Sequence, residues 1–299
     1  MNRVFALWGL LAAPLLIGPT VAAEKAAIPD FTGAWARNAF NMEAPASGPG
    51  PLANLRRVGK DATAYILGGD PVPLVGDYKN PILKPETAAI VKKFGDMSLN
   101  HFGFHNPRNQ CWPNGIPFVL SANGLQIFQQ ADKITMLYQT DHQVRRVRMN
   151  AQHPAKVTPT YYGDSVGHYE GDTLVIDTIG VKPGPFAMVD WFGTPQTPSL
   201  HVVERYRLLD YAQAKEGLDR ANKENALPAP AAVDLSYRGK HLQLTFTVED
   251  PTVFTTPWTA TVTMGKPVVE WAENVCAENP RKYGTEEDAQ VPTAAKPDF

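Results

Sequence analysis

A β-hairpin in the middle of the chain constrains the fold more than any other stretch. Its strands, Ser165–Tyr169 and Thr173–Ile179, are separated by a short reversal in which Gly171 supplies the positive φ of a tight turn. Successive residues of a strand face opposite sides, so Asp177 shares a face with apolar neighbours. A carboxylate in that position must find a hydrogen-bond donor or give up its charge.

Other segments at short spacing share the strand pattern of the hairpin. They are an opening strand around Trp35, Leu125–Gln130, Lys133–Tyr138, Asp141–Met149, Leu200–Leu209, His241–Glu249, Thr256–Met264 and Val268–Ala272. About eight strands joined mostly by brief turns predict an all-β, mainly antiparallel fold, a lipocalin-like meander that closes into a barrel. A two-sheet sandwich is the alternative that the same pattern allows.

The segments outside the strands divide the chain into regions. Residues 24–110 are rich in Pro and Gly and contain the opening strand and one predicted short helix, Thr87–Phe94, which follows a proline and is rich in Ala. Residues 111–278 are expected to form the antiparallel barrel domain. Residues 211–227 are polar and suit a helix, so we expect a surface insertion there. The polar tail at 279–299 is expected to be loose.

The first 23 residues have the pattern of a secretory signal peptide. A basic residue precedes the apolar run Val4–Ile17, and small residues lie at Val21 and Ala23, which predicts cleavage before Glu24. No later segment is long and apolar enough to span a bilayer. The mature protein is therefore expected to be exported and soluble, periplasmic in a Gram-negative cell, without stable membrane insertion.

Charge and motifs exclude several classes of function. The chain has 28 Lys and Arg against 30 Asp and Glu, which gives no basic surface for nucleic acid. It contains no GxGxxG, P-loop, GxSxG or EF-hand pattern, so no nucleotide cofactor and no common serine-hydrolase site is expected. His101 and His105 stand four residues apart, but Gly103 and Pro107 disfavour the helix that would present both to a metal. We expect neither a metal nor another cofactor.

A series of motifs resembles a widespread family of exported bacterial proteins of largely unassigned function. In order, the motifs are CWPNGIPF, DHQVRRVR, SVGHYEGDTLVIDTIG, SLHVVERYR, EDPTVFTTPW and ENVCAEN, covering roughly residues 107–279. Family members often carry His ahead of the S-x-G of the hairpin, where this chain has Asp164. The resemblance implies a cofactor-free lyase that decarboxylates lignin-derived phenolic dimers.

Two strands carry most of the candidate polar residues. In Asp141–Met149, His142 and Arg146 share one face and Arg145 lies on the other; in Leu200–Leu209, Glu204 falls in an apolar row. Arg145 or Arg146 is the expected partner of that carboxylate. One interpretation is a buried ion pair that fixes strand register. The other is a site in the barrel lumen where Arg binds a substrate carboxylate and a histidine exchanges protons.

The resemblance, combined with these positions, assigns candidate roles for a decarboxylase. A histidine would take the phenolic proton, an arginine would orient the carboxylate, and two further groups would handle a second proton, while two carboxylates orient the others. The candidate for the histidine is His142 or His201, and the arginine is Arg146. Tyr161 and Asp164 are the candidates for the second proton, and Glu204 and Asp177 are the orienting carboxylates. The alternative is a non-catalytic periplasmic protein that binds a hydrophobic or aromatic small molecule. The many titratable residues on the strands favour the enzyme.

Cys111 and Cys276 are expected to form a disulfide, because an even pair in an exported protein is usually oxidised. The bridge would tie the start of the strand region to its end and contribute roughly 5 kcal/mol in the chain-entropy model. Titration of denatured, unreduced protein with a thiol reagent should detect no free thiol. Two reactive thiols per chain would refute the pairing.

Overall fold

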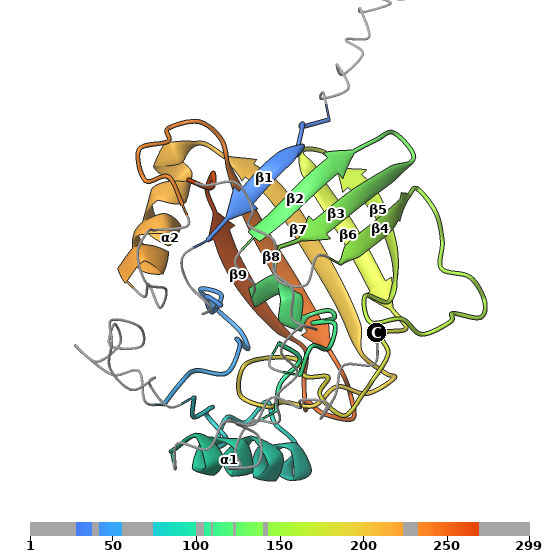
Figure 1. The fold of residues 1–299 in the computed structure, drawn as a ribbon, viewed down its shortest axis with the longest axis vertical. Coiled ribbons are helices and arrows are strands. Elements are labelled where there is room, and N and C mark those ends of the chain that lie inside the picture. The colour runs from blue at the N-terminus through green and yellow to red at the C-terminus, as the bar shows by residue number, and fades with distance from the viewer. Residues whose placement is uncertain are drawn as a thin grey trace, which may run out of the picture.

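The computed structural model describes residues 28–37, 42–55, 74–99, 105–108, 110–121, 124–139, 143–223 and 233–268. Figure 1 shows strands curving around a common axis, with one helix below an end of the sheet and another beside it. The elements are β1 (Gly33–Ala36), α1 (Pro85–Leu99), the 3-10 helix η2 (Phe118–Ser121), β2 (Gly124–Gln129), β3 (Lys133–Tyr138), β4 (Val144–Met149), β5 (Asp164–Glu170), β6 (Thr173–Ile179), β7 (His201–Leu209), α2 (Tyr211–Lys223), β8 (His241–Glu249) and β9 (Trp258–Met264).

All nine strands lie in one sheet whose spatial order follows the sequence from β1 to β9. The sheet turns back on itself, because Ala36 at the end of β1 and Gly265 after β9 exchange two backbone hydrogen bonds of 2.8 Å. The predicted all-β barrel is therefore confirmed, and the alternative sandwich is not what the chain forms. The strand β1 comes from the Pro/Gly-rich region before residue 111, so that region contributes to the barrel.

One pair of neighbouring strands departs from an antiparallel meander. Strands β4 and β5 are parallel, with Val147 opposite Ser165 and Met149 opposite Gly167. A parallel pair cannot be joined by a tight turn, so the chain crosses between them through residues 150–163. This crossover contains His153, whose contacts are described with the candidate functional site.

The expected elements agree closely with those observed. Three strands have the predicted bounds, namely β3, β6 and β8, and the predicted helix is present but longer, Pro85–Leu99. The polar segment after β7 does form a helix, α2. The strand predicted at Val268–Ala272 lies almost entirely outside the described residues, and Val268 itself is in a bend. The signal peptide, Cys276 and the tail at 279–299 also lie outside them, so these stay predictions.

The two helices cover different parts of the barrel (Figure 1). Helix α1 is tied to the loop after β8, where Thr87 Oγ1 donates to the carbonyl of Val253 at 3.1 Å. Helix α2 packs through Ala214 and Leu218 against Leu209 and lies on the outer side of β7, β8 and β9. Within the described part of the chain, neither helix has the length and apolar character needed to cross a membrane.

The interior of the barrel is filled by side chains. Fully or almost fully buried apolar side chains come from every strand from β2 to β9 except β5, whose buried residues are Ser165 and Gly167 and whose Tyr169 is half-buried. They include Ile127, Met136, Val147, Leu174, Tyr206, Leu244 and Val262. Trp35 of β1 is also buried, as expected, and its indole Nε1 donates to the carbonyl of Phe31 at 3.0 Å.

A buried ion pair lies among these apolar side chains. The guanidinium of Arg145 donates from Nη2 to Glu204 Oε1 at 2.6 Å and from Nη1 to Oε2 at 3.0 Å. Arg145 also donates to Ser165 Oγ at 3.0 Å and to Thr178 Oγ1 at 2.7 Å, and Tyr206 donates its hydroxyl to Glu204 Oε2 at 2.6 Å. These five residues, with Tyr138, whose hydroxyl accepts from Arg145 Nη1 at 3.2 Å, form what we call the interior network.

The interior network satisfies both charges with hydrogen bonds, as buried ions require. Burial alone would lower the pKa of Arg145, but the charge and hydrogen bonds of Glu204, together with Tyr138 and Tyr206, outweigh it and hold that pKa well above its ordinary value. Burial and the same carboxylate raise the pKa of Tyr206 well above its usual range. The partner of Glu204 is thus Arg145. Arg146 lies on the opposite, exposed face of β4.

Breaking this ion pair on one side should destabilise the fold strongly. Glu204→Leu leaves the Arg145 guanidinium buried without its counter-ion, and we expect a loss of about 3–5 kcal/mol in the free energy of unfolding measured in urea. Arg146→Gln, next to it in sequence but exposed, should change that free energy by less than about 0.5 kcal/mol.

The double variant Arg145→Met with Glu204→Leu removes both charges together. It should be more stable than Glu204→Leu alone, because no buried charge is left unpaired. Equal unfolding free energies for Glu204→Leu and Arg146→Gln would contradict the account of the interior network.

Candidate functional site

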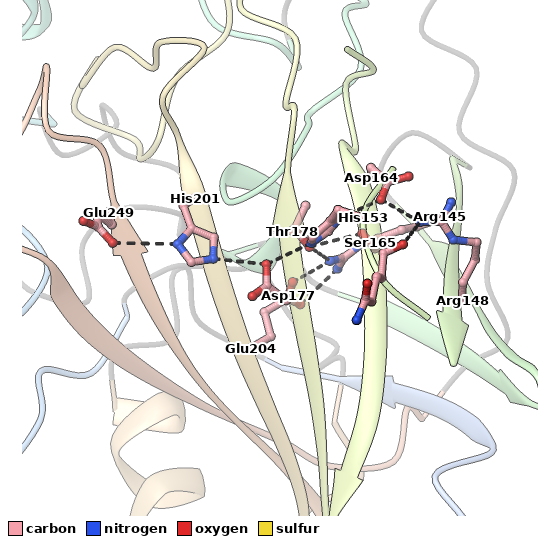
Figure 2. Close-up of polar contacts among 11 residues, drawn as sticks. Arg145, Arg148, His153, Asp164, Ser165, Asp177, Thr178, His201, Glu204 and Glu249 are labelled. Atoms are coloured by element: carbon pink, nitrogen blue, oxygen red, sulfur yellow. Dashed lines mark hydrogen bonds and ion pairs between the residues drawn. The ribbon is translucent and has the colours of Figure 1, made fainter. Parts of the chain in front are cut away.

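A row of alternating basic and acidic side chains crosses the outer face of the sheet at one end of the barrel (Figure 2). Each member contacts the next through a hydrogen bond or ion pair. In order, the members are Arg148, Asp164, His153, Asp177, His201 and Glu249, which we call the Asp–His chain. It is the largest connected set of titratable side chains on the outer surface of the described strands.

Strand pairing positions most of the Asp–His chain. Asp164 begins β5 and His201 begins β7, while Asp177 lies near the end of β6 and Glu249 ends β8. Because β5 to β8 are successive antiparallel neighbours, these positions meet at one end of the sheet, and His201 lies directly opposite Glu249. Their side chains point outward, since the alternate residues of each strand face the core.

His153 is supplied by the crossover between β4 and β5. Its Nδ1 lies 2.7 Å from Asp164 Oδ1, and its Nε2 lies 3.1 Å from Asp177 Oδ1. Both carboxylates can only accept hydrogen bonds when ionised, so both ring nitrogens must carry protons to make these contacts. The ring of His153 thus lies between two carboxylates, partly shielded from solvent at 20% side-chain exposure, and donates to both of them when both nitrogens carry protons.

His201 has a different environment. Its Nε2 lies 3.1 Å from the same oxygen of Asp177, whereas its Nδ1 is 3.7 Å from Glu249 Oε2, beyond hydrogen-bond distance. With Nε2 donating to Asp177, Nδ1 is the position at which the ring takes up or releases a proton. The His201 side chain is 36% exposed, so this nitrogen is within reach of a ligand at the surface.

The other end of the Asp–His chain is closed by Arg148. Its Nη2 donates to Asp164 Oδ1 at 2.8 Å and to the carbonyl of Gln152 at 3.3 Å. Asp164 Oδ1 thus accepts from Arg148 and from His153 together. Asp164 therefore anchors the crossover rather than offering a free carboxylate.

A second group of side chains lies on the loops at the same end of the barrel. The ring of Trp112 meets Tyr161 edge to face at 5.4 Å between centroids, and meets Phe186 at 5.7 Å. His105 lies 5.8 Å from Phe186. The ammonium of Lys182 lies over Tyr161, 5.1 Å from the ring centroid. We call these residues the aromatic cluster; its tryptophan, tyrosine and phenylalanine are only half-buried.

The structure brings together some of the residues proposed from the sequence and separates others. Asp164, Asp177 and His201 belong to the Asp–His chain, and Tyr161 belongs to the aromatic cluster. Glu204 faces the interior, as described above. Of the two arginines that the sequence offered as its partner, Arg146 does not meet it, because Arg146 and Glu204 lie on opposite faces of the sheet. His142 lies outside the described residues.

Sequence reasoning missed His153, Arg148 and Glu249 as members of the site. His153 precedes a proline in a segment without strand alternation, and only the parallel pairing of β4 with β5 explains why this segment returns across the sheet. The signal that was present is Asp177, whose need for a donor on an otherwise apolar row is met by two histidines. Glu249 could have been found from its register opposite His201.

The site has no further support from known proteins. Comparisons of the chain with protein-family models, with curated proteins and with solved structures found no match. Asp177 with two histidines has the ligand types of a metal site, yet among the described residues no group of three His, Cys, Asp or Glu is arranged to hold a metal ion. What the site can do must be argued from its geometry.

The protonation of His153 can be measured directly. Long-range proton–nitrogen correlation spectra at neutral pH should show both ring nitrogens of His153 in the protonated form, because each donates to a carboxylate. Asp164→Asn replaces one of the two acceptors and should populate a neutral tautomer. Asp172→Asn, on the turn at the other end of the same hairpin, is the matched control. A neutral ring for His153 in the wild-type protein would contradict the assignment.

Proposed function

We propose that this protein is an exported, cofactor-independent lyase of the decarboxylase type, acting on a phenolic or aromatic acid through acid–base chemistry. The observation that carries the proposal is that one oxygen of Asp177 binds a ring nitrogen of His153 and one of His201 on a solvent-accessible face. The type of reaction and the class of substrate follow from the motif resemblance and the predicted signal peptide. On that basis we propose lignin-derived phenolic acids as substrates.

The two histidines differ in what they can do. His201 has one nitrogen fixed by Asp177 and the other available for proton exchange, which is the arrangement of an oriented general base. His153 has both nitrogens occupied by carboxylates, so it cannot accept a proton while these contacts last. We therefore assign His201 as the base and His153 as the residue that positions Asp177.

The proposed reaction needs proton transfer but no cofactor. His201 takes the proton of the substrate phenol and keeps it, and the phenolate expels an oxygen from the adjacent side-chain carbon. That oxygen takes up a second proton from solvent and leaves as a neutral alcohol, which gives a quinone methide. The bond to the carboxylate then breaks and releases CO₂. Its electron pair forms a carbon–carbon double bond and restores the aromatic phenolate, which a proton from His201 neutralises.

The interior of the barrel is an unfavourable place for this chemistry. The polar groups of the interior network are buried and bonded to one another, and Arg145 and Glu204 are 1% and 0% exposed. A ligand there would have to displace core side chains and separate a buried ion pair. The Asp–His chain needs no such rearrangement, so the proposed site is the outer, loop-bearing end of the barrel. Tyr161 and the aromatic cluster lie at that end of the barrel. We assign the exposed Arg146 no contact with this proposed site.

The alternative is a binding protein for an aromatic small molecule without catalysis. The half-buried aromatic cluster with Lys182 favours it, because stacked rings and one cation are sufficient to hold such a ligand. The two functions differ in one observable result. A carrier returns its ligand unchanged, and its affinity does not depend on the proton-exchanging nitrogen of His201.

His201→Gln tests the proposed base. The glutamine can still contact Asp177 but cannot exchange a proton, so CO₂ release from a panel of phenolic acids should fall by about 100-fold or more. His168→Gln changes another exposed histidine on the outer face, one that contacts only Glu170, and should leave the rate unchanged.

Equal rates for the His201→Gln and His168→Gln variants would refute the acid–base assignment. If the wild-type protein binds members of the panel but releases no CO₂ from any of them, the carrier alternative is correct.

A further inference from the structure

We infer that the aromatic cluster and Lys182 form a binding site for a planar aromatic anion. This deepens the proposed function, on which it rests for the view that the bound ring belongs to a substrate. The site is formed by loops rather than by strands. Trp112 comes from the segment before η2, Tyr161 from the end of the crossover, and Phe186 with Lys182 from the connection between β6 and β7.

The first argument is the position of the rings. Trp35 and Trp258, which pack within the core, are buried at 2% exposure, whereas Tyr161 packs only partly against it. Trp112, Tyr161 and Phe186 are instead half-buried, although they contact one another edge to face at interplanar angles of 80°. Three loops therefore hold a set of rings at the surface where a further ring can add to the cluster.

The second argument is an indole donor. The Nε1 atom of Trp112 is shielded from water, and none of the residues that the structure describes is its hydrogen-bond partner. An indole N–H in this position usually finds an acceptor. A carboxylate or phenolic oxygen on a ring bound to the cluster would provide one. This requirement favours a ligand with acceptor oxygens over a hydrocarbon.

The third argument is charge. In the described residues of these loops, 105–121, 150–163 and 181–200, the cationic side chains are Arg108, Lys156 and Lys182, apart from His153, which is paired with two carboxylates of the Asp–His chain. The single carboxylate in the same segments is Asp190. It is buried, which raises its pKa, and it accepts hydrogen bonds from Thr194 Oγ1 and from the backbone of Phe192. Solvent-facing charge at this end is thus positive on the loops, which favours an anionic ligand.

The fourth argument is the link to the Asp–His chain. Lys182 donates its backbone N–H to the carbonyl of Thr160 at 2.7 Å, and Thr160 donates to Gly180 at 3.2 Å. The backbone that carries Tyr161 therefore runs beside the backbone that carries Lys182. The first continues into β5, which begins with Asp164, and the second leaves β6, which carries Asp177. A ring held by the cluster is bound at the same end of the barrel as the proposed base.

The probe for this site is 4-hydroxybenzoate, with 4-hydroxybenzyl alcohol as the uncharged analogue. In proton–nitrogen spectra of the full mature protein, the indole signal of Trp112 is assigned by its loss in the Trp112→Phe variant. Addition of 4-hydroxybenzoate should shift this signal, and the shift should saturate at millimolar concentration. The alcohol should bind more weakly by roughly two- to fivefold, because it lacks the charge that Lys182 recognises.

Two variants separate the ring from the cation. Trp112→Ala should weaken binding of 4-hydroxybenzoate by about tenfold or more, through loss of the central ring of the cluster. Lys182→Gln should weaken it by roughly two- to fivefold and abolish the preference over the alcohol. Lys240→Gln, which removes an equally exposed cation near α2, is the matched control and should bind as the wild type does.

The inference is overturned if the Trp112 signal does not respond to 4-hydroxybenzoate, or if the acid and the alcohol bind with equal affinity. It is also overturned if Lys182→Gln and Lys240→Gln have the same effect. Failure of the proposed function gives a different result. In that case 4-hydroxybenzoate binds as described, but His201→Gln does not change the rate of CO₂ release. The site would then belong to a carrier. Lys182→Gln retains the aromatic core, so its result does not depend on the folding of Trp112→Ala.

Discussion

The buried pair of Arg145 and Glu204 is the constraint on which the rest of the structure depends. Two charges removed from water must have all their hydrogen-bonding atoms satisfied, and here four strands supply the partners. Ser165 and Thr178 contribute from β5 and β6. These contacts form only when β4, β5, β6 and β7 are aligned in one register, since a shift by one residue would turn each group to the other face.

The same register determines the functional face. The four strands that supply Arg145, Ser165, Thr178 and Glu204 to the interior network also contribute to the Asp–His chain, each at a position of opposite parity. Ser165 faces inward and Asp164 outward, and Thr178 faces inward and Asp177 outward. In β7, Glu204 is inside and His201 outside; in β4, Arg145 is inside and Arg148 outside. The interior network therefore stabilises the fold and, through strand alternation, aligns the outer groups. The groups that stabilise the fold and the groups proposed for proton transfer therefore lie on opposite faces of the same strands.

Much of the fold could be predicted because its strands alternate regularly. The bounds of β3, β6 and β8 follow from the sequence, and the need of Glu204 for an arginine was evident from its apolar row. The choice of Arg145 over Arg146 depends on which face of β4 is buried. Val147 and Met149 share the face of Arg145, but Val144 shares the exposed face of Arg146, so the pattern alone is weak there.

The candidate site was harder to predict, because it depends on a connection that has no local signal. The crossover between β4 and β5 lacks periodicity, and nothing near His153 in the sequence indicates that it lies between Asp164 and Asp177. The position of His153 is decided by the pairing of segments that are distant in the sequence. The same is true of the contacts of Trp112 with Tyr161 and Phe186. Sequence reasoning could identify carboxylates that need partners, and only the topology could supply the partners.

The central claim is that the interior of the barrel specifies the fold while its outer, loop-bearing end binds and transforms the ligand. A crystal structure of the protein with a bound aromatic acid tests this most directly. The account predicts density for the ring against Trp112 and Tyr161, with the ion pair of Arg145 and Glu204 unbroken. Density inside the barrel, with Tyr206 displaced and that ion pair separated, would contradict it.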